Sequence, residues 1–122
     1  MEGHLRKFVE KIKLFQTTIH PKRYFVIDFQ GALLYIQKDK FEKKPENIKQ
    51  VLFRDIIDCY LPKKDVKHSM PKGWLHCLYL QTTDRLYILC AKCLEDRNMW
   101  MSGFRYIIAS TITVQTIMKN NN

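Results

Sequence analysis

Residues 23–36 read RYFVIDFQGALLYI, and this stretch decides the fold class of the chain. Two runs rich in aromatic, β-branched and other apolar residues, 23–29 and 32–36, flank Gln30 and Gly31. Such runs favour strands, and a short glycine-containing connection between two strands is typical of a hairpin. The sequence therefore predicts an antiparallel hairpin over residues 23–36.

Further strands are predicted on both sides of this hairpin. A short strand is expected at residues 5–9, and one bent strand or two short ones at residues 51–53 and 56–61. Residues 74–80 and 85–90 flank a Gln-Thr-Thr-Asp turn and form a second hairpin. Residues 38–49 are a polar loop of mixed charge, which is equally consistent with a solvated loop and a ligand-binding one. Seven strands is the natural count.

The periodicity changes after the last predicted strand. From Leu94 onward, apolar residues recur at helical spacing: Trp100, Phe104, Ile107 and Ile108. A stripe of this kind is typical of a helix that packs on a core, so we expect it to cap the sheet. Strands followed by one helix give a mainly β fold.

Length, composition and charge limit the organisation and the partners. The 122 residues are 46% hydrophobic, which suits one domain over residues 1–119 with a frayed tail at 120–122. The net charge of +9 favours polyanionic partners such as phospholipids or nucleic acid. The N-terminus has no apolar signal core, and no run approaches the roughly 18 apolar residues of a membrane span. We therefore expect a cytoplasmic protein.

The sequence carries little that points to catalysis, a metal or a cofactor. It lacks a phosphate-binding glycine loop, and the four histidines lie far apart. Cys90 and Cys93 have the spacing of a zinc or redox pair, but no second pair accompanies them. The simpler interpretation is that Cys90 packs at a strand end and Cys93 lies near the helix start. All four cysteines, Cys59, Cys77, Cys90 and Cys93, are expected to be buried thiols rather than disulfides.

The strongest functional signal is a basic segment at the N-terminal side. Between His4 and Arg23 there are six Lys or Arg residues against Glu10 alone. If residues 5–9 pair with the strand that begins near Arg23, these cations converge at one end of the sheet and form an anion pocket. Within the segment, apolar residues alternate with lysines, which serves either membrane attachment or an extended strand with a core-facing side. The residues in question are Lys11, Ile12, Lys13, Leu14 and Phe15.

Several of these stretches together resemble the pleckstrin homology (PH) domain family, from residue 2 to about residue 110. The stretch EGHLRK at 2–7 is similar to the family's first strand, and KRYFVI at 22–27 with GALLY at 31–35 resembles its second and third strands. Residues 78–91 resemble the last hairpin, and Trp100 falls where the family's closing helix carries a tryptophan. The resemblance implies a seven-stranded bent sheet, a partly open barrel, capped by one C-terminal helix. It also implies no catalysis and no cofactor.

The resemblance implies a binding site as well. Lys7 matches the lysine that phosphoinositide-binding members place in the first strand, and Arg23 matches the arginine at the start of the second. Pro21 occupies the position of a further basic residue, so Lys22 and His20 are the flanking candidates for phosphate contact. With fewer fixed cations, a single exposed phosphate is favoured over a multiply phosphorylated inositol ring.

These observations predict a membrane-targeting module that is peripheral on a cytosolic membrane face and binds phosphatidic acid or a phosphoinositide. Lys11 and Lys13 would supply electrostatic attraction, and Leu14 and Phe15 would insert. The Lys, Ile and Asn bias resembles the acylated apical PH proteins of apicomplexan parasites, whose acyl anchor would lie outside these residues. The alternative is a protein-interaction domain. Nucleic acid is not expected, since the aromatic residues fall at core positions, and the domain is expected to be a monomer.

Overall fold

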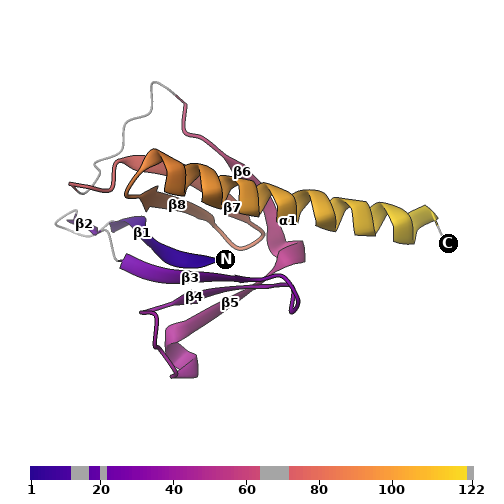
Figure 1. Cartoon of the computed structure of the whole chain (residues 1–122), viewed down its shortest axis with the longest axis horizontal. Coiled ribbons are helices and arrows are strands. Elements are labelled where there is room, and N and C mark those ends of the chain that lie inside the picture. The colour runs from indigo at the N-terminus through magenta and orange to yellow at the C-terminus, as the bar shows by residue number, and fades with distance from the viewer. Residues whose placement is uncertain (12–16, 20–21, 64–71, 121–122) are drawn as a thin grey trace.

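A computed structural model describes residues 1–11, 17–19, 22–63 and 72–120 of the chain. Its strands are β1 (Glu2–Lys11), β2 (Thr17–Ile19), β3 (Lys22–Asp28), β4 (Leu33–Gln37), β5 (Ile48–Leu52), β6 (Ile56–Tyr60), β7 (His76–Thr82) and β8 (Leu86–Ala91). Short 3-10 turns, Pro45–Asn47 and Phe53–Asp55, precede and follow β5, and the helix α1 spans Leu94–Asn120. The mainly β plan with a closing helix is confirmed (Figure 1).

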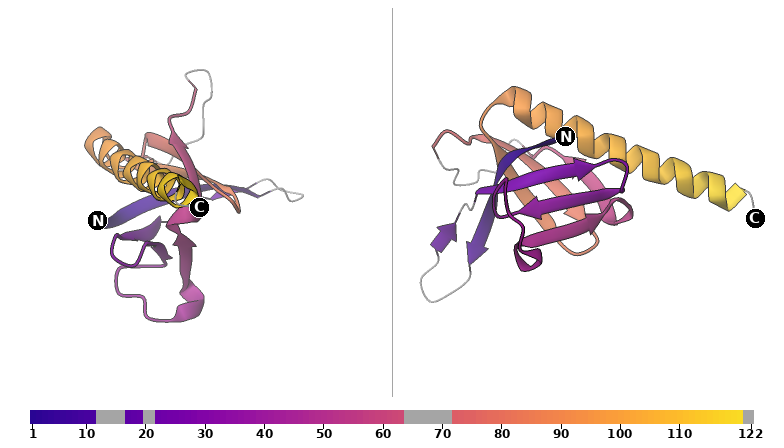
Figure 2. Two further views of the ribbon diagram at one scale, coloured as in Figure 1. Left: turned by 90° about the vertical axis from the view of Figure 1, so that its right-hand side faces the viewer. Right: turned by 60° about the horizontal axis from the view of Figure 1, so that its bottom comes forward.

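Seven of these strands form one antiparallel sheet in the order β5-β4-β3-β1-β8-β7-β6, and β2 pairs only with β1. The predicted hairpin is the β3–β4 pair, in which Phe25 lies opposite Ile36. The first strand pairs with β3 on one side and with β8 on the other, so it joins the two hairpins into a single curved sheet. Figure 2 shows that this sheet is strongly bent and not closed, as predicted.

The concave face of the sheet and the first part of α1 enclose the core. Trp100 and Phe104 are fully buried, and the ring of Trp100 lies edge-on to Phe25 at 6.0 Å between centroids. Gly3 permits this close packing, because a Cβ atom there would lie 3.3 Å from the Trp100 ring. The helix therefore caps the sheet at the predicted apolar stripe.

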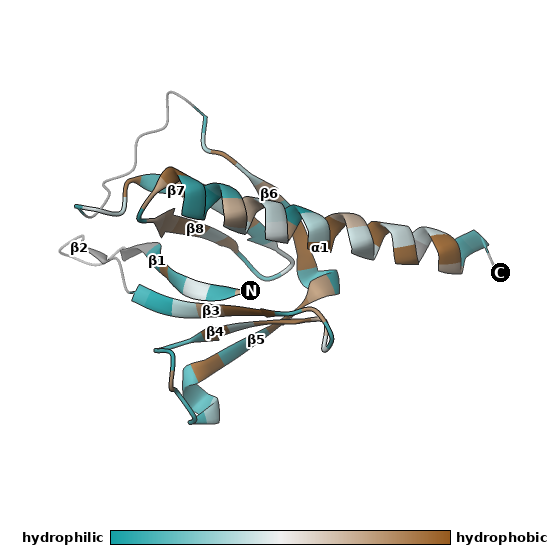
Figure 3. Ribbon diagram, viewed as in Figure 1, coloured by the Kyte–Doolittle hydropathy of each residue, from teal (hydrophilic) through white to brown (hydrophobic). Residues whose placement is uncertain are grey.

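The helix continues well beyond the sheet (Figure 1). Apolar residues also continue along this overhang (Figure 3), where Ile112, Val114, Ile117 and Met118 are each more than half exposed. Three threonine hydroxyls on this part of the helix donate to the carbonyl four residues earlier, each at 2.9 Å. Within the described ranges, no helix is long and apolar enough to cross a bilayer.

Several predicted boundaries differ from the structure. The predicted loop 38–49 ends two residues early, because Ile48 and Lys49 pair with β4 as the start of β5. The segment at 51–61 forms two strands separated by a 3-10 turn, the second of the two alternatives predicted for it. In the β3–β4 turn, Ala32 has the left-handed backbone conformation, with φ of 55°.

Candidate anion-binding site

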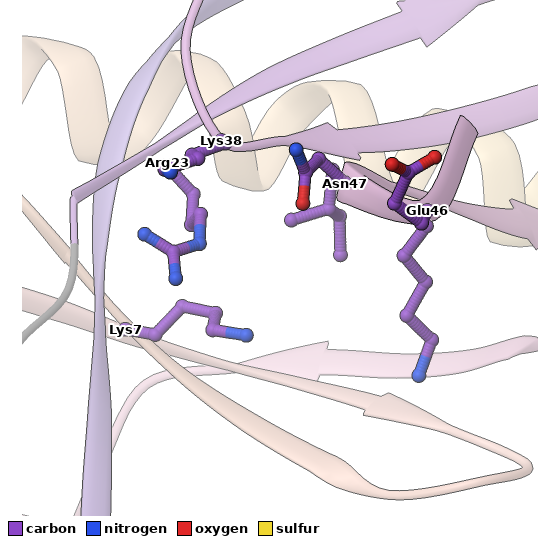
Figure 4. Close-up of a pocket in the computed structure, with 7 residues that line it drawn as sticks. Lys7, Arg23, Lys38, Glu46 and Asn47 are labelled. Carbon is purple, nitrogen blue, oxygen red and sulfur yellow. The ribbon is translucent and has the colours of Figure 1, made fainter. Parts of the chain in front are cut away.

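A cavity of about 420 Å³ opens at the end of the sheet where β1 runs toward β2 and β3 begins. Its lining includes four cations, one carboxylate, one amide and one apolar side chain: Lys7, Arg23, Lys38, Lys49, Glu46, Asn47 and Ile36. Figure 4 shows the Arg23 guanidinium directed toward Lys7. Four cations against one carboxylate make the cavity strongly positive.

Strand alternation and register place three of these cations on the core face of the sheet. Lys7 lies opposite the fully buried Leu89, and Arg23 lies opposite the fully buried Leu5. Lys49 lies opposite Ile36, which is also buried. Directly opposed residues in an antiparallel pair project to the same face. The cations are therefore the continuation of the core layer at its open end, where apolar side chains give way to charged ones.

Lys7 is the most perturbed of these cations. Burial, followed by the charges of Arg85, Arg23 and Lys49, lowers the pKa of Lys7 from 10.5 to about 8. Its ammonium nitrogen also lies 5.8 Å from the centroid of the Tyr87 ring. A partly buried ammonium among like charges is costly to keep protonated. An anion bound in the cavity would offset this cost.

Lys49 contacts two side chains, Tyr87 and Asp84, and both raise its pKa. The Tyr87 ring is buried, and Lys49 Nζ lies 5.5 Å from its centroid. The nearby Tyr87 hydroxyl is the largest cause of the raised pKa of Lys49. The contact between them does not meet the geometry of a hydrogen bond, and among the described residues the buried hydroxyl has no hydrogen-bond partner. Lys49 also forms an exposed ion pair with Asp84, 2.9 Å from Nζ to Oδ2. Asp84 thus competes with any external anion for Lys49.

The structure brings together two of the predicted headgroup residues, Lys7 and Arg23. Lys22 lies opposite Arg6 and is exposed on the other face of β3, where its charge is the second cause, after burial, of the lowered pKa of His4. Of the predicted membrane contacts, Lys11 ends β1 opposite Thr17. Four of the predicted residues, His20, Lys13, Leu14 and Phe15, lie outside the described residues.

Sequence reasoning missed Lys38, Lys49, Glu46 and Asn47, because it treated residues 38–49 as a loop. A signal was present: if the strand at 33–37 continues into a hairpin with 48–52, Lys49 faces the apolar Ile36. Which residue of β5 lies opposite Ile36 depends on where the loop ends and the strand begins. The polar composition of residues 38–49 gives no sign of that boundary.

The lining chemistry suits binding. Lysine and arginine donate charge-assisted hydrogen bonds to phosphate or carboxylate oxygens. None of the lining residues that the structure describes is a Ser, Cys or His nucleophile. No group of three or more His, Cys, Asp or Glu side chains in the described part could hold a metal ion.

Comparison with known proteins places this arrangement in a family. The profile described as PH domain matches residues 1–109. No curated protein matches the chain in sequence. Among solved structures, the chain is similar to the PH domain of human TBC1 domain family member 2 protein, with a TM-score of 0.62 and 16% identity over 93% of this chain and 83% of that one.

Two further solution structures of human proteins show the same fold. The PH domain of oxysterol binding protein-related protein 11 gives a TM-score of 0.63 at 14% identity over 93% of this chain and 83% of that one. The N-terminal PH domain of ARAP2 gives 0.61 at 18% identity over 90% and 79%. Identities this low establish the fold alone, whereas the profile match covers most of the chain. The chain therefore belongs to the PH domain family.

Proposed function

We propose that this PH domain recruits its host protein to membranes by binding an anionic phospholipid headgroup, preferentially phosphatidic acid, in the cationic cavity. PH domains generally act as membrane-binding or protein-interaction modules. The observation that favours a lipid here is the cavity, with four cations against one carboxylate and with Lys7 partly buried among like charges.

In this proposal Lys7 and Arg23 hold the phosphate, and Lys38 and Lys49 line its far side. Each is a donor of charge-assisted hydrogen bonds, and a hydrogen bond to a charged group contributes about 1.5–3 kcal/mol. Lys22, on the opposite face of β3, adds to the positive field at this end of the domain. Basic residues near an anionic surface contribute about 1 kcal/mol each.

A single phosphate suits the cavity better than a bisphosphate ring. Asp84 already occupies part of the hydrogen-bonding capacity of Lys49, and Pro21 takes the place where a further cation would be expected from the family pattern. Among the described lining residues, this leaves Lys7, Arg23 and Lys38 as the cations that form no ion pair with a carboxylate. With the Glu46 carboxylate in the same lining, these three cations leave a charge of +2, which balances one phosphate monoester dianion, the headgroup of phosphatidic acid. Kinship with the acylated apical PH proteins stays a prediction.

Vesicle flotation at fixed near-physiological salt tests the proposal. Neutral vesicles are compared with vesicles of matched charge that contain phosphatidic acid, phosphatidylserine or a phosphatidylinositol bisphosphate. We expect selective flotation with phosphatidic acid and about a tenfold loss in Arg23→Gln, because one charge-assisted contact is removed. Lys119→Gln removes the same charge at the far end of α1 and is the matched control, expected to change binding less than about twofold.

Each other outcome contradicts a distinct part of the proposal. Equal flotation on all anionic vesicles would mean a nonspecific basic surface. Preference for the bisphosphate would retain the site but overturn the choice of phosphatidic acid. Equal losses in Arg23→Gln and Lys119→Gln would remove the cavity from the mechanism. No flotation at all would favour the protein-interaction alternative.

A further inference from the structure

Two cysteines lie side by side on the convex face of the sheet, away from the cationic cavity. Cys77 on β7 and Cys90 on β8 are directly opposed across the strands, and their sulfur atoms are 3.9 Å apart. Together with Trp74 they form a small apolar cluster that is separate from the main core. The cavity and the proposed headgroup binding use neither thiol.

The two thiols are not equivalent in exposure. Cys77 is 8% exposed, whereas Cys90 is completely buried. Of the two residues, Cys77 is therefore the one that a small reagent reaches first.

The pKa values of the two thiols also differ, and the lower one belongs to the more exposed residue, Cys77. The hydrogen bond between the two thiols lowers the pKa of Cys77, and the positive charge of Arg97 lowers it further, against the effect of burial. The same hydrogen bond, together with burial, raises the pKa of Cys90. The nucleophilic thiolate thus forms at the more exposed sulfur, and the proton stays on the other one.

The strand register also allows a covalent link. Directly opposed residues in antiparallel strands have Cα atoms about 4.5–5.5 Å apart, which lies within the range that disulfides span. The sulfur atoms, 3.9 Å apart, would have to approach to the bond length of about 2.05 Å. No third ligand accompanies the pair in the described part of the chain, so a metal site is not favoured.

We propose that Cys77 and Cys90 form an oxidisable dithiol, in which a hydroperoxide oxidises Cys77 and Cys90 then closes a cross-strand disulfide. This inference does not depend on the proposed headgroup binding. The hydroperoxide is the oxidant and accepts both electrons.

The chemistry proceeds in two balanced steps. The Cys77 thiolate attacks a peroxide oxygen, the O–O bond breaks, and the leaving hydroxide or alkoxide takes up a proton, which leaves a sulfenic acid on Cys77. The Cys90 sulfur then attacks the Cys77 sulfur, the S–O bond breaks, and the hydroxyl leaves as water with the Cys90 proton. With hydrogen peroxide, two thiols and one peroxide give one disulfide and two water molecules.

Cys59 provides an internal control. It is buried on β6 against the main core, and burial raises its pKa to about 12. A thiol of this kind carries almost no thiolate near neutral pH, so peroxide and alkylating reagents should spare it while the chain stays folded.

The test treats the folded protein with hydrogen peroxide and maps its peptides by mass spectrometry without reduction. We expect a Cys77–Cys90 crosslink, the loss of two hydrogens, and reversal by dithiothreitol. In Cys90→Ser, a sulfenic acid should persist on Cys77 and react with dimedone at least about tenfold faster than any label appears on Cys59. Cys59→Ser should crosslink as the unaltered protein does.

Because the crosslink is sought in the unaltered chain, the test does not depend on the variants folding. A crosslink between Cys90 and Cys93, equal labelling of Cys59 and Cys77, or no crosslink in protein whose circular dichroism is unchanged would each overturn the proposal. Crosslinking that appears only after the dichroism signal is lost would also overturn it, since the pair would then react only in unfolded chains.

Discussion

Replacing Lys7 with methionine should stabilise the free domain while weakening its binding to anionic vesicles. Methionine keeps the length and the apolar packing of the lysine stem but removes the ammonium. That ammonium is partly buried and is repelled by Arg85, Arg23 and Lys49, so its removal takes away an unfavourable interaction. The same ammonium is proposed to contact the phosphate, so binding is lost with it.

The size of the effect follows from the pKa of Lys7. A fall from 10.5 to about 8 sets an upper limit of about 3 kcal/mol on the cost of the charge, since one pKa unit corresponds to about 1.36 kcal/mol. Lys7 is only partly buried, and solvent screens its repulsion. We therefore expect Lys7→Met to raise the free energy of unfolding by about 1 kcal/mol at pH 6 to 7.

The sign of the pH dependence is a second, independent check. Below pH 8, Lys7 is protonated in both the folded and the unfolded chain, and the full cost is present. Between pH 8 and 10.5 the folded chain releases this proton while the unfolded chain keeps it, so the unaltered protein gains stability as the pH rises. The advantage of Lys7→Met should therefore shrink across this range.

Urea unfolding of both proteins at several pH values measures this difference, and subtraction cancels the other groups that titrate in the same range. Lys119→Met is the matched control, since Lys119 is exposed at the far end of α1. A Lys7→Met variant that is less stable than the unaltered protein near neutral pH, or a stability difference that does not change with pH, would refute the electrostatic account of Lys7.

Four further substitutions have expected outcomes. Asp84→Asn removes the carboxylate that pairs with Lys49, so vesicle affinity should rise about two- to fivefold, while the free energy of unfolding should stay nearly the same because the pair is exposed. Flotation and urea titration measure the two effects, and reduced affinity would contradict the competition between Asp84 and the headgroup. Ala32→Gly should stabilise the domain by about 0.5–1 kcal/mol in urea unfolding, because φ at Ala32 is 55°, and destabilisation would contradict the strain. Trp100→Ala should cost about 3–5 kcal/mol, whereas Ile117→Ser on the exposed overhang should cost less than about 1 kcal/mol, and similar losses would show that the overhang is packed in solution.

The local elements of the fold were accessible from the residues. Periodicity and turn residues within a short window predict three elements: the hairpin at 23–36, the hairpin at 74–90 and the closing helix. The helix stripe also identified three core residues, since Trp100, Phe104 and Ile107 are buried, whereas its fourth member, Ile108, is only partly buried against the core. The concentration of positive charge near the first strand was equally plain, because it depends on composition alone.

The site could be predicted only in part, because it depends on pairings between distant strands. Lys7 and Arg23 were found through the family pattern, and register shows that both lie on the core face. Adjacent residues in a strand project to opposite faces, so Lys22 is on the other side of the sheet although it is next to Arg23 in sequence. No count along the chain tells which of the two faces the interior until β1 is paired with β3.

The residue pattern accounts for the mainly β plan, the two hairpins, the capping helix and the positive charge, since each is a matter of local preference or simple counting. The pairing of the strands in space decided two further features. It places Lys49 and Lys7 in the lining of one cavity, and it places Cys77 opposite Cys90. The physical reason is that a shift of one residue in register sends every side chain of a strand to the opposite face. Packing of the whole core, and not any local segment, selects the register that is observed.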